Sequence, residues 1–310
     1  MFKISRNHSF SQIHSVKKSL EDKYIERNDV ILATLLTIIA GEHMLLIGPP
    51  GAAKSAVLEN FCSYIRDCVY FQWLLTKKTH PDELLGPFDE REKEYGIYKR
   101  LTKNKLPEAH IAFLDETLKA EGDTLNSLLT LLNERVFIQE GVPKKAPLIS
   151  VFGASNEFPE NDDLVALYDR FLIRMEVSYI KDSYNLTRLL SKPPKPSDST
   201  FESLSLEDIR ALKQDARKVE IDESIIGKIV RIRERLFQNG IYPSDRRLKN
   251  SLVVLQANAA LNERKRVVED DLSILRYILW TRPKEQELVD SIIDDILENK
   301  TLLKGDEIHE

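Results

Sequence analysis

Short apolar runs alternate with longer helical patterns through the first 190 residues of the chain. Three runs are apolar at nearly every position, which is typical of strands buried on both faces of a sheet: residues 44–47, 111–114 and 148–152. Between the last two runs, leucines recur at helical spacing over residues 125–132. A strand, a helix and a strand in this order predict a parallel sheet covered by helices, which is an α/β fold.

A proline-rich, polar segment divides the chain at residues 191–204. Its prolines lack amide donors, so the segment is predicted to be a linker or a surface loop. Beyond it only helical patterns follow, and residues 205–208 resemble a capping box that opens the first helix. We therefore expect an α/β domain over residues 1–190 and a small helical domain with a C-terminal helix over residues 205–310.

The composition narrows the class of protein. With 42% hydrophobic and 31% charged residues, the 310-residue chain is typical of a soluble globular protein. Its 45 basic and 50 acidic side chains leave a net charge of −5, which disfavours a dedicated nucleic-acid binder. Cys62 and Cys68 indicate free thiols in a reducing compartment. The start has no secretory signal and the longest apolar run, 30–41, is shorter than the ~20 residues that span a bilayer, so we expect a cytoplasmic protein without membrane insertion.

A glycine- and proline-rich loop follows the first predicted strand and precedes a helical pattern, as a phosphate-binding loop requires. Its backbone amides and the helix N-terminus can hold the phosphates of ATP. Lys54 would bridge the β- and γ-phosphates, and the Ser55 hydroxyl would ligate Mg²⁺. The expected nucleotide ligands are the whole loop: Gly48, Pro49, Pro50, Gly51, Ala52, Ala53, Lys54 and Ser55.

Ala53 departs from the usual loop pattern, in which glycine precedes the lysine. Alanine is costly only where φ is positive. In the first turn of a helix φ is expected to be negative, so we expect nucleotide binding to survive. The alternative is an ordinary glycine-proline turn followed by a chance lysine.

The second predicted strand ends in two acids, Asp115 and Glu116. The carboxyl ends of parallel strands are where open α/β sheets bind their ligands. Asp115 would hold Mg²⁺ through water, and Glu116 would polarise the water that attacks the γ-phosphate. An apolar run ending in two acids is weakly specific alone, but together with the phosphate loop it indicates an ATPase.

Two further side chains fit the same chemistry. Asn156 ends the third predicted strand and could hydrogen-bond the γ-phosphate or the water, although an asparagine in a plain turn explains it too. Arg170 could be an arginine finger that stabilises the charge of the transferring phosphoryl group. A surface ion pair with Asp169 or Asp163 is the alternative for Arg170.

The ordered motifs resemble those of the MoxR family of AAA+ ATPases, most closely its RavA branch, over roughly residues 15–295. The Ala-Lys-Ser form of the loop is itself familiar in that branch. The motifs are GPPGAAKS (48–55), FLDE (113–116), LLTLLNERVF (128–137), GASNEFPE (153–160), ALYDRFLIR (166–174) and SDRR (244–247), with similar sequence at 84–87 and 24–27.

The resemblance implies an αβα nucleotide-binding domain followed by a helical lid, assembled as a hexameric ring with ATP at the subunit interfaces. Arg170 would reach the ATP of the neighbouring protomer. Arg246 matches the sensor-2 arginine, and the adjacent Arg247 is an open alternative. The sequence does not decide whether the sensor-2 arginine acts in cis or in trans. Tyr24 and Arg27 would approach the adenine.

The resemblance also assigns two loops. Residues 76–105 take the place of the MoxR insertion, and Gly86 and Gly96 could let this insert turn back as a hairpin. Residues 136–147 would form the hairpin before sensor 1, and such loops commonly face the pore of related rings. The RavA branch usually continues beyond the lid into partner-binding domains that this sequence does not include.

The function expected from these features is a chaperone-like ATPase that remodels another protein or complex. The client is unknown, and family analogy suggests a VWA-domain protein. A nucleic-acid motor is one alternative, supported by four basic residues among the seven of segment 99–105. An ATP-gated scaffold without turnover is the other, supported only by Ala53. The six histidines show no metal-ligand spacing.

Overall fold

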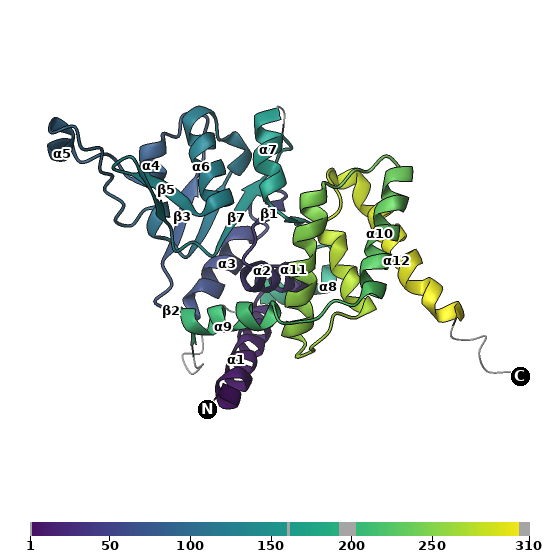
Figure 1. Ribbon diagram of the computed structural model, residues 1–310. Coiled ribbons are helices and arrows are strands. Elements are labelled where there is room, and N and C mark those ends of the chain that lie inside the picture. Colours follow the sequence, from purple (N-terminus) through teal and green to yellow (C-terminus); the bar gives the residue numbers. More distant parts are fainter. Residues whose placement is uncertain (1, 160–161, 192–202, 304–310) are drawn as a thin grey trace, which may run out of the picture. The chain divides into compact units, whose positions relative to one another are not determined.

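Five parallel strands form the central sheet, in the order β3-β4-β7-β1-β8. The computed structural model describes residues 2–159, 162–191 and 203–303 (Figure 1). The strands are β1 (Met44–Ile47), β3 (Tyr70–Leu74), β4 (Ile111–Asp115), β7 (Ser150–Ser155) and β8 (Ile173–Glu176). Every residue of β1 and β7 is buried, as the apolar runs predict. The α/β fold is confirmed.

Helices cover both faces of this sheet (Figure 1). On one face lie α1 (Phe2–Lys23), α2 (Asn28–Ala40) and α3 (Lys54–Ser63). On the other lie α6 (Gly122–Glu134) and α7 (Asp162–Arg170). The leucine stripe of α6 is buried. This arrangement is the αβα sandwich that the motif set implies.

The chain divides into two compact units, residues 1–209 and 210–310. The sequence places the linker earlier, at 191–204, and residues 192–202 of that segment lie outside the described residues. The boundary falls later because β9 (Leu204–Ser205) pairs with β2 (Ile65–Arg66) of the first unit. Asp208 adds to this attachment, since its Oδ1 accepts a 2.6 Å hydrogen bond from Ser9 of α1.

The predicted capping box opens α9 (Leu206–Ala216). The Ser205 hydroxyl accepts from the Asp208 amide at 3.1 Å, and the Asp208 carboxylate accepts from the Ser205 amide at 2.8 Å. The second unit continues with α10 (Glu223–Gln238), α11 (Asp245–Leu261), η3 (Glu269–Tyr277), η4 (Pro283–Glu285) and α12 (Gln286–Leu303). The predicted helical domain is confirmed, and its core holds the fully buried Trp280.

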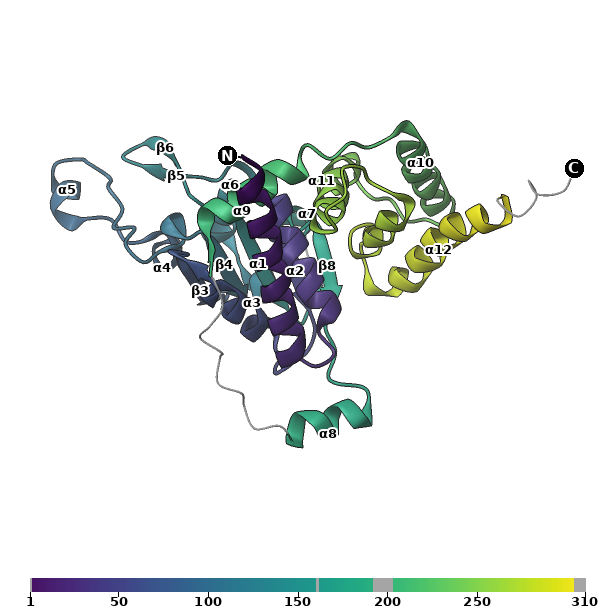
Figure 2. The ribbon, with the colours of Figure 1, turned by 90° about the horizontal axis from the view of Figure 1, so that it is seen from below.

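The insert and the hairpin extend from the same side of the first unit (Figure 2). The insert contains α4 (Pro81–Leu85) and α5 (Glu90–Glu94), and it turns back through an antiparallel bridge between Phe88 and Arg100; η1 (Leu106–Glu108) follows it. Gly86 has φ 93°, and a side chain there would collide with the Leu101 carbonyl. The predicted hairpin consists of β5 (Val136–Gln139) and β6 (Val142–Lys145).

Neither cysteine takes part in a disulfide, as predicted for free thiols. Within the described part of the chain, no helix combines the length and the apolar character needed to span a membrane.

Candidate functional site

The phosphate loop fills the gap between β1 and α3, so the strand-loop-helix context predicted for residues 48–55 is present. Gly48 donates its amide to the Ser155 carbonyl at 3.0 Å. A side chain at Gly48 would collide with the Val177 carbonyl, so only glycine fits where the loop crosses the end of β8. The Tyr179 hydroxyl donates to the Pro50 carbonyl at 3.2 Å. The loop is therefore held by the ends of β7 and β8.

Ala53 adopts a left-handed conformation, with φ 63° and ψ 25°. The expectation of a negative φ is wrong, because Ala53 is the N-cap residue at which the loop turns into α3 rather than part of the first helical turn. A left-handed alanine costs roughly 1 kcal/mol relative to glycine. This cost gives a physical reason for the glycine that the usual pattern has at this position.

Lys54 begins α3 and its ammonium points back across the loop. It donates to the carbonyl of Gly48, to that of Pro49 at 3.3 Å, and to Asn156 Oδ1 at 3.2 Å. Burial lowers the pKa of Lys54, while the negative charges of Asp115 and Glu116 oppose this shift. The lysine thus lies between the phosphate loop and the two acids.

The ends of β4 and β7 meet beside the loop, as expected for neighbouring parallel strands. Asp115 is the last residue of β4, and its Oδ1 accepts from the Glu116 amide at 3.0 Å. Asn156 Nδ2 donates to Glu116 Oε1 at 3.1 Å. Glu116 Oε2 lies 3.4 Å from Lys119 Nζ, a partner that sequence analysis missed. The contact depends on the left-handed turn at Glu116, which the sequence pattern does not indicate.

A magnesium ion fits this set of side chains. In the described ranges, no three His, Cys, Asp or Glu side chains gather closely enough to hold a metal. Mg²⁺ suits such a site, because it usually keeps several waters and binds one or two protein oxygens together with phosphate. Ser55 in the first turn of α3 and Asp115 at the end of β4 supply oxygens of this kind.

Residues 24–27, which precede α2, contact the phosphate loop and the start of α3. Tyr24 donates its hydroxyl to the Ala56 carbonyl at 2.8 Å, and burial raises the pKa of Tyr24. Arg27 is only 7% exposed and donates to the carbonyls of Ala52 at 3.1 Å and Ser178 at 2.8 Å. Burial lowers the pKa of Arg27, with the nearby Glu26 opposing the shift. Arg27 therefore supports the loop through backbone carbonyls, and contact of either residue with adenine stays a prediction.

Arg170 is the last residue of α7, and its Nη1 lies 3.9 Å from Asp169 Oδ2. Asp169 is one of the two ion-pair partners considered for it, and the side chain of the other, Asp163, lies outside the described residues. The contact is long for an ion pair, and Asp169 is equally distant from Arg174. A role for Arg170 at a neighbouring protomer stays a prediction.

The second unit separates the two sensor-2 candidates. Ser244 caps α11 by accepting from the Arg247 amide at 3.2 Å. Arg247 is 3% exposed and donates from Nη1 to the Ile278 carbonyl at 2.8 Å, so its guanidinium supports the interior of the lid. Arg246 is exposed. Only Arg246 is therefore accessible to a ligand in this conformation of the unit.

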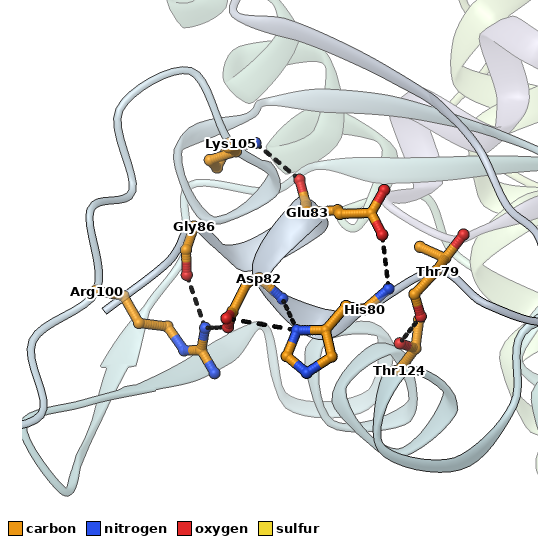
Figure 3. Close-up of polar contacts among 8 residues, drawn as sticks. All are labelled: Thr79, His80, Asp82, Glu83, Gly86, Arg100, Lys105 and Thr124. Carbon is orange, nitrogen blue, oxygen red and sulfur yellow. Dashed lines mark hydrogen bonds and ion pairs between the residues drawn. The ribbon is translucent and has the colours of Figure 1, made fainter. Parts of the chain in front are cut away.

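A hydrogen-bond network fixes the base of the insert (Figure 3). Arg100 Nη1 donates to Asp82 Oδ1 at 2.5 Å and to the Gly86 carbonyl at 2.6 Å. Lys105 donates to the Glu83 carbonyl at 2.9 Å, so the returning limb of the insert is tied to α4 at two points. This network explains how a segment with little regular structure keeps a defined path.

The insert is also joined to the β5–β6 hairpin. The Arg100 amide donates to Gln139 Oε1 at 3.0 Å, and Gln139 Nε2 donates to the Arg100 carbonyl at 3.1 Å. The Glu140 amide donates to the Tyr98 carbonyl at 3.0 Å. Nothing in the sequence pattern marks Gln139 as a partner of the insert, so this connection was not predicted. A cleft of about 290 Å³ lies between Arg100, the hairpin and α6.

Two family descriptions match the chain. The description "MoxR domain in the MoxR-vWA-beta-propeller ternary systems" matches residues 11–214, and "AAA lid domain" matches residues 224–293. Together they cover both structural units.

Several known proteins are similar to it. Two uncharacterized proteins of Methanocaldococcus jannaschii are 40% and 39% identical over 286 and 274 residues, which is 92% and 88% of this chain and 74% and 72% of theirs. A structural protein of Acidianus two-tailed virus is 27% identical over 231 residues, which is 71% of this chain and 36% of the viral protein. The solved structure of an ATPase candidate from Cytophaga hutchinsonii matches with a TM-score of 0.75 over 96% of both chains, at 19% identity, and shares the fold.

Proposed function

Because the chain belongs to the MoxR family of AAA+ ATPases, we propose that it hydrolyses ATP to ADP and phosphate at the loop between β1 and α3. The observation that carries this proposal is the continuous set of side-chain contacts from Lys54 through Asn156 to Glu116. It joins the lysine that would bind phosphate to the acid that would orient water. The alternative, a glycine-proline turn followed by a chance lysine, does not account for these contacts.

Each side chain has a role in this reaction. Lys54 binds the β- and γ-phosphates, and Ser55 and Asp115 would hold Mg²⁺, which supplies positive charge to the phosphates when bound. Glu116 orients the attacking water and accepts its proton, while Asn156 holds the carboxylate in place. The water oxygen forms a bond to the γ-phosphorus, and the bond to the β,γ-bridging oxygen breaks, so ADP carries the leaving oxygen.

We propose that two arginines complete the site from elsewhere. Arg170 would come from a neighbouring copy in a ring, most simply a hexamer, and stabilise the transferring phosphoryl charge. Arg246 would come from the lid, since Arg247 is committed to the Ile278 carbonyl. Tyr24 and Arg27 would lie near the adenine. The nearer likeness to the RavA branch and the cytoplasmic location stay predictions.

The proposed work of the ATPase is chaperone-like remodelling of a partner protein. The insert and hairpin support this role, because Tyr95, Tyr98 and Ile138 are exposed by 82%, 54% and 52% on segments that are bonded to each other. The matched family description names MoxR–vWA systems, so we propose a VWA-domain protein as the partner.

Steady-state ATP hydrolysis by wild type, Lys54→Ala and Glu116→Gln tests the proposal. Both variants should lose nearly all turnover, and Glu116→Gln should retain ATP binding. Lys144→Ala, which removes an exposed lysine of β6, is the matched control and should hydrolyse ATP normally. Unchanged turnover in both site variants would rule out this assignment.

The same preparations separate the two alternative functions. Tight ATP binding without phosphate release, under conditions where a ring forms, would favour the scaffold without turnover. Retention on single- or double-stranded DNA that weakens steeply with salt would favour the nucleic-acid motor.

A further inference from the structure

Glu116 is contacted on both of its carboxylate oxygens. Asn156 donates to Oε1 at 3.1 Å, and Lys119 Nζ lies 3.4 Å from Oε2. Asn156 belongs to the predicted site, whereas no role has been assigned to Lys119. The lysine side chain is 38% exposed and the glutamate side chain 20% exposed, so the pair lies at the edge of the site.

The local backbone builds this pair into the fold. Glu116 adopts a left-handed conformation with φ 51°, which turns the chain sharply at the end of β4. The next three residues form the short helix η2 (Thr117–Lys119), and the Lys119 amide donates to the Glu116 carbonyl at 2.9 Å. Thr117 is fully buried and donates its hydroxyl to the Leu114 carbonyl at 2.5 Å. Lys119 therefore starts from a backbone position that is fixed relative to Glu116.

Such a pair contributes little to folding, because exposed ion pairs are screened by water. The main effect of the Lys119–Glu116 pair is to orient the Glu116 carboxylate. A glutamate side chain has several rotatable bonds, and a contact on one oxygen alone leaves the other free to swing away from the attacking water. Contacts on both oxygens define one direction for the group.

We propose, on the basis of the proposed ATPase function, that Lys119 is a positioning residue that fixes the carboxylate of Glu116 for activation of water. It acts through Glu116 and does not bind the nucleotide. Its loss therefore lowers the rate of the chemical step and leaves ATP binding unchanged.

Lys119→Met removes the charge and keeps most of the side-chain length. We expect kcat to fall roughly five-fold with KM for ATP and the melting temperature unchanged, in line with the strength of an exposed pair. Lys119→Arg should restore most of the loss. Lys77→Met is the matched control, because Lys77 also forms an exposed ion pair, 3.2 Å from Glu121, but does not touch Glu116.

Three results would overturn the inference: an unchanged or raised kcat in Lys119→Met, an equal loss in Lys77→Met, or a loss in Lys119→Met that Lys119→Arg does not recover. Failure of the proposed function has a different signature. In that case wild type itself shows no turnover, or Glu116→Gln hydrolyses ATP at the wild-type rate, and the role of Lys119 falls with it.

Discussion

The amide of Asn156 donates to Glu116 Oε1 at 3.1 Å, across 40 positions of sequence. The opposite end of the same amide accepts from Lys54 Nζ at 3.2 Å. Asn156 is thus in contact with both the lysine proposed to bind phosphate and the acid proposed to orient water. The Asn156 side chain therefore sets the separation between the Lys54 ammonium and the Glu116 carboxylate.

Replacing Asn156 by alanine should lower kcat by about a hundred-fold, which is the usual effect of removing one preorganised polar contact from a reacting centre. ATP affinity should change little, because the loop amides and Lys54 remain. Rapid-mixing measurements of hydrolysis and of nucleotide binding test the two effects separately. Asn126→Ala on the exposed part of α6 is the control. A loss of affinity with an intact kcat would contradict this role.

Replacing Ala53 by glycine should stabilise the protein by about 1 kcal/mol, since glycine adopts a left-handed conformation without the steric cost that alanine has. Ala56→Gly, inside α3, should have the opposite sign and destabilise by a similar amount. Denaturant unfolding of the two variants measures the difference. If both substitutions destabilise equally, the left-handed assignment of Ala53 is wrong.

The two lid arginines should differ in what their loss does. Arg247→Ala should destabilise the second unit by about 2–3 kcal/mol, because a buried guanidinium loses its bond to the Ile278 carbonyl. Arg246→Ala should leave stability within about 0.5 kcal/mol and reduce ATP turnover. Thermal unfolding and ATPase assays of both variants check this division. Normal turnover in a stable Arg246→Ala protein would exclude it as the sensor-2 arginine.

Stability should respond to pH through Lys54. Burial lowers the pKa of Lys54, so the folded chain releases this proton at a lower pH than the unfolded chain does. At pH 7 the ammonium is charged in both states and opposes folding. As the pH rises through the lowered pKa, this opposition is lost and stability increases.

Lys54→Met lacks the titrating group and provides the comparison. Between neutral and alkaline pH, wild type should gain unfolding free energy relative to Lys54→Met in nucleotide-free buffer. Chemical denaturation of both proteins over a pH series measures the gain. A relative loss for wild type with rising pH would show that the acids beside Lys54 outweigh its burial.

The sheet and the meeting of Glu116 with Asn156 could be predicted from sequence, because uninterrupted apolar runs define buried parallel strands and their carboxyl ends share one edge. The conformation of Ala53 could not, since the φ of a loop residue depends on where the helix begins rather than on the residue type. Lys119 was missed for a related reason. Its contact depends on the sharp turn at Glu116, and a left-handed glutamate has no sequence signature.

The later domain boundary and the joined loops have a common physical cause. Residues 204 and 205 pair with β2 through backbone hydrogen bonds, and a strand of two residues is too short to show a side-chain pattern that predicts this pairing. Gln139 looks like an ordinary polar residue of a hairpin, yet it is 7% exposed and bonds both backbone groups of Arg100. Long-range hydrogen bonds of this kind follow from tertiary structure, whereas hydrophobic periodicity reports only on nearby residues.

The insert and the hairpin are joined to each other and to α6 by hydrogen bonds. Thr124 at the start of α6 donates to the Thr79 carbonyl just before α4. Arg100 donates to Asp82 of α4, and its backbone carbonyl accepts from Gln139 of the hairpin. These bonds connect α6, the helix that follows the short turn after Glu116, to both protruding loops. A partner that binds these loops would therefore meet one joined surface rather than two independent segments.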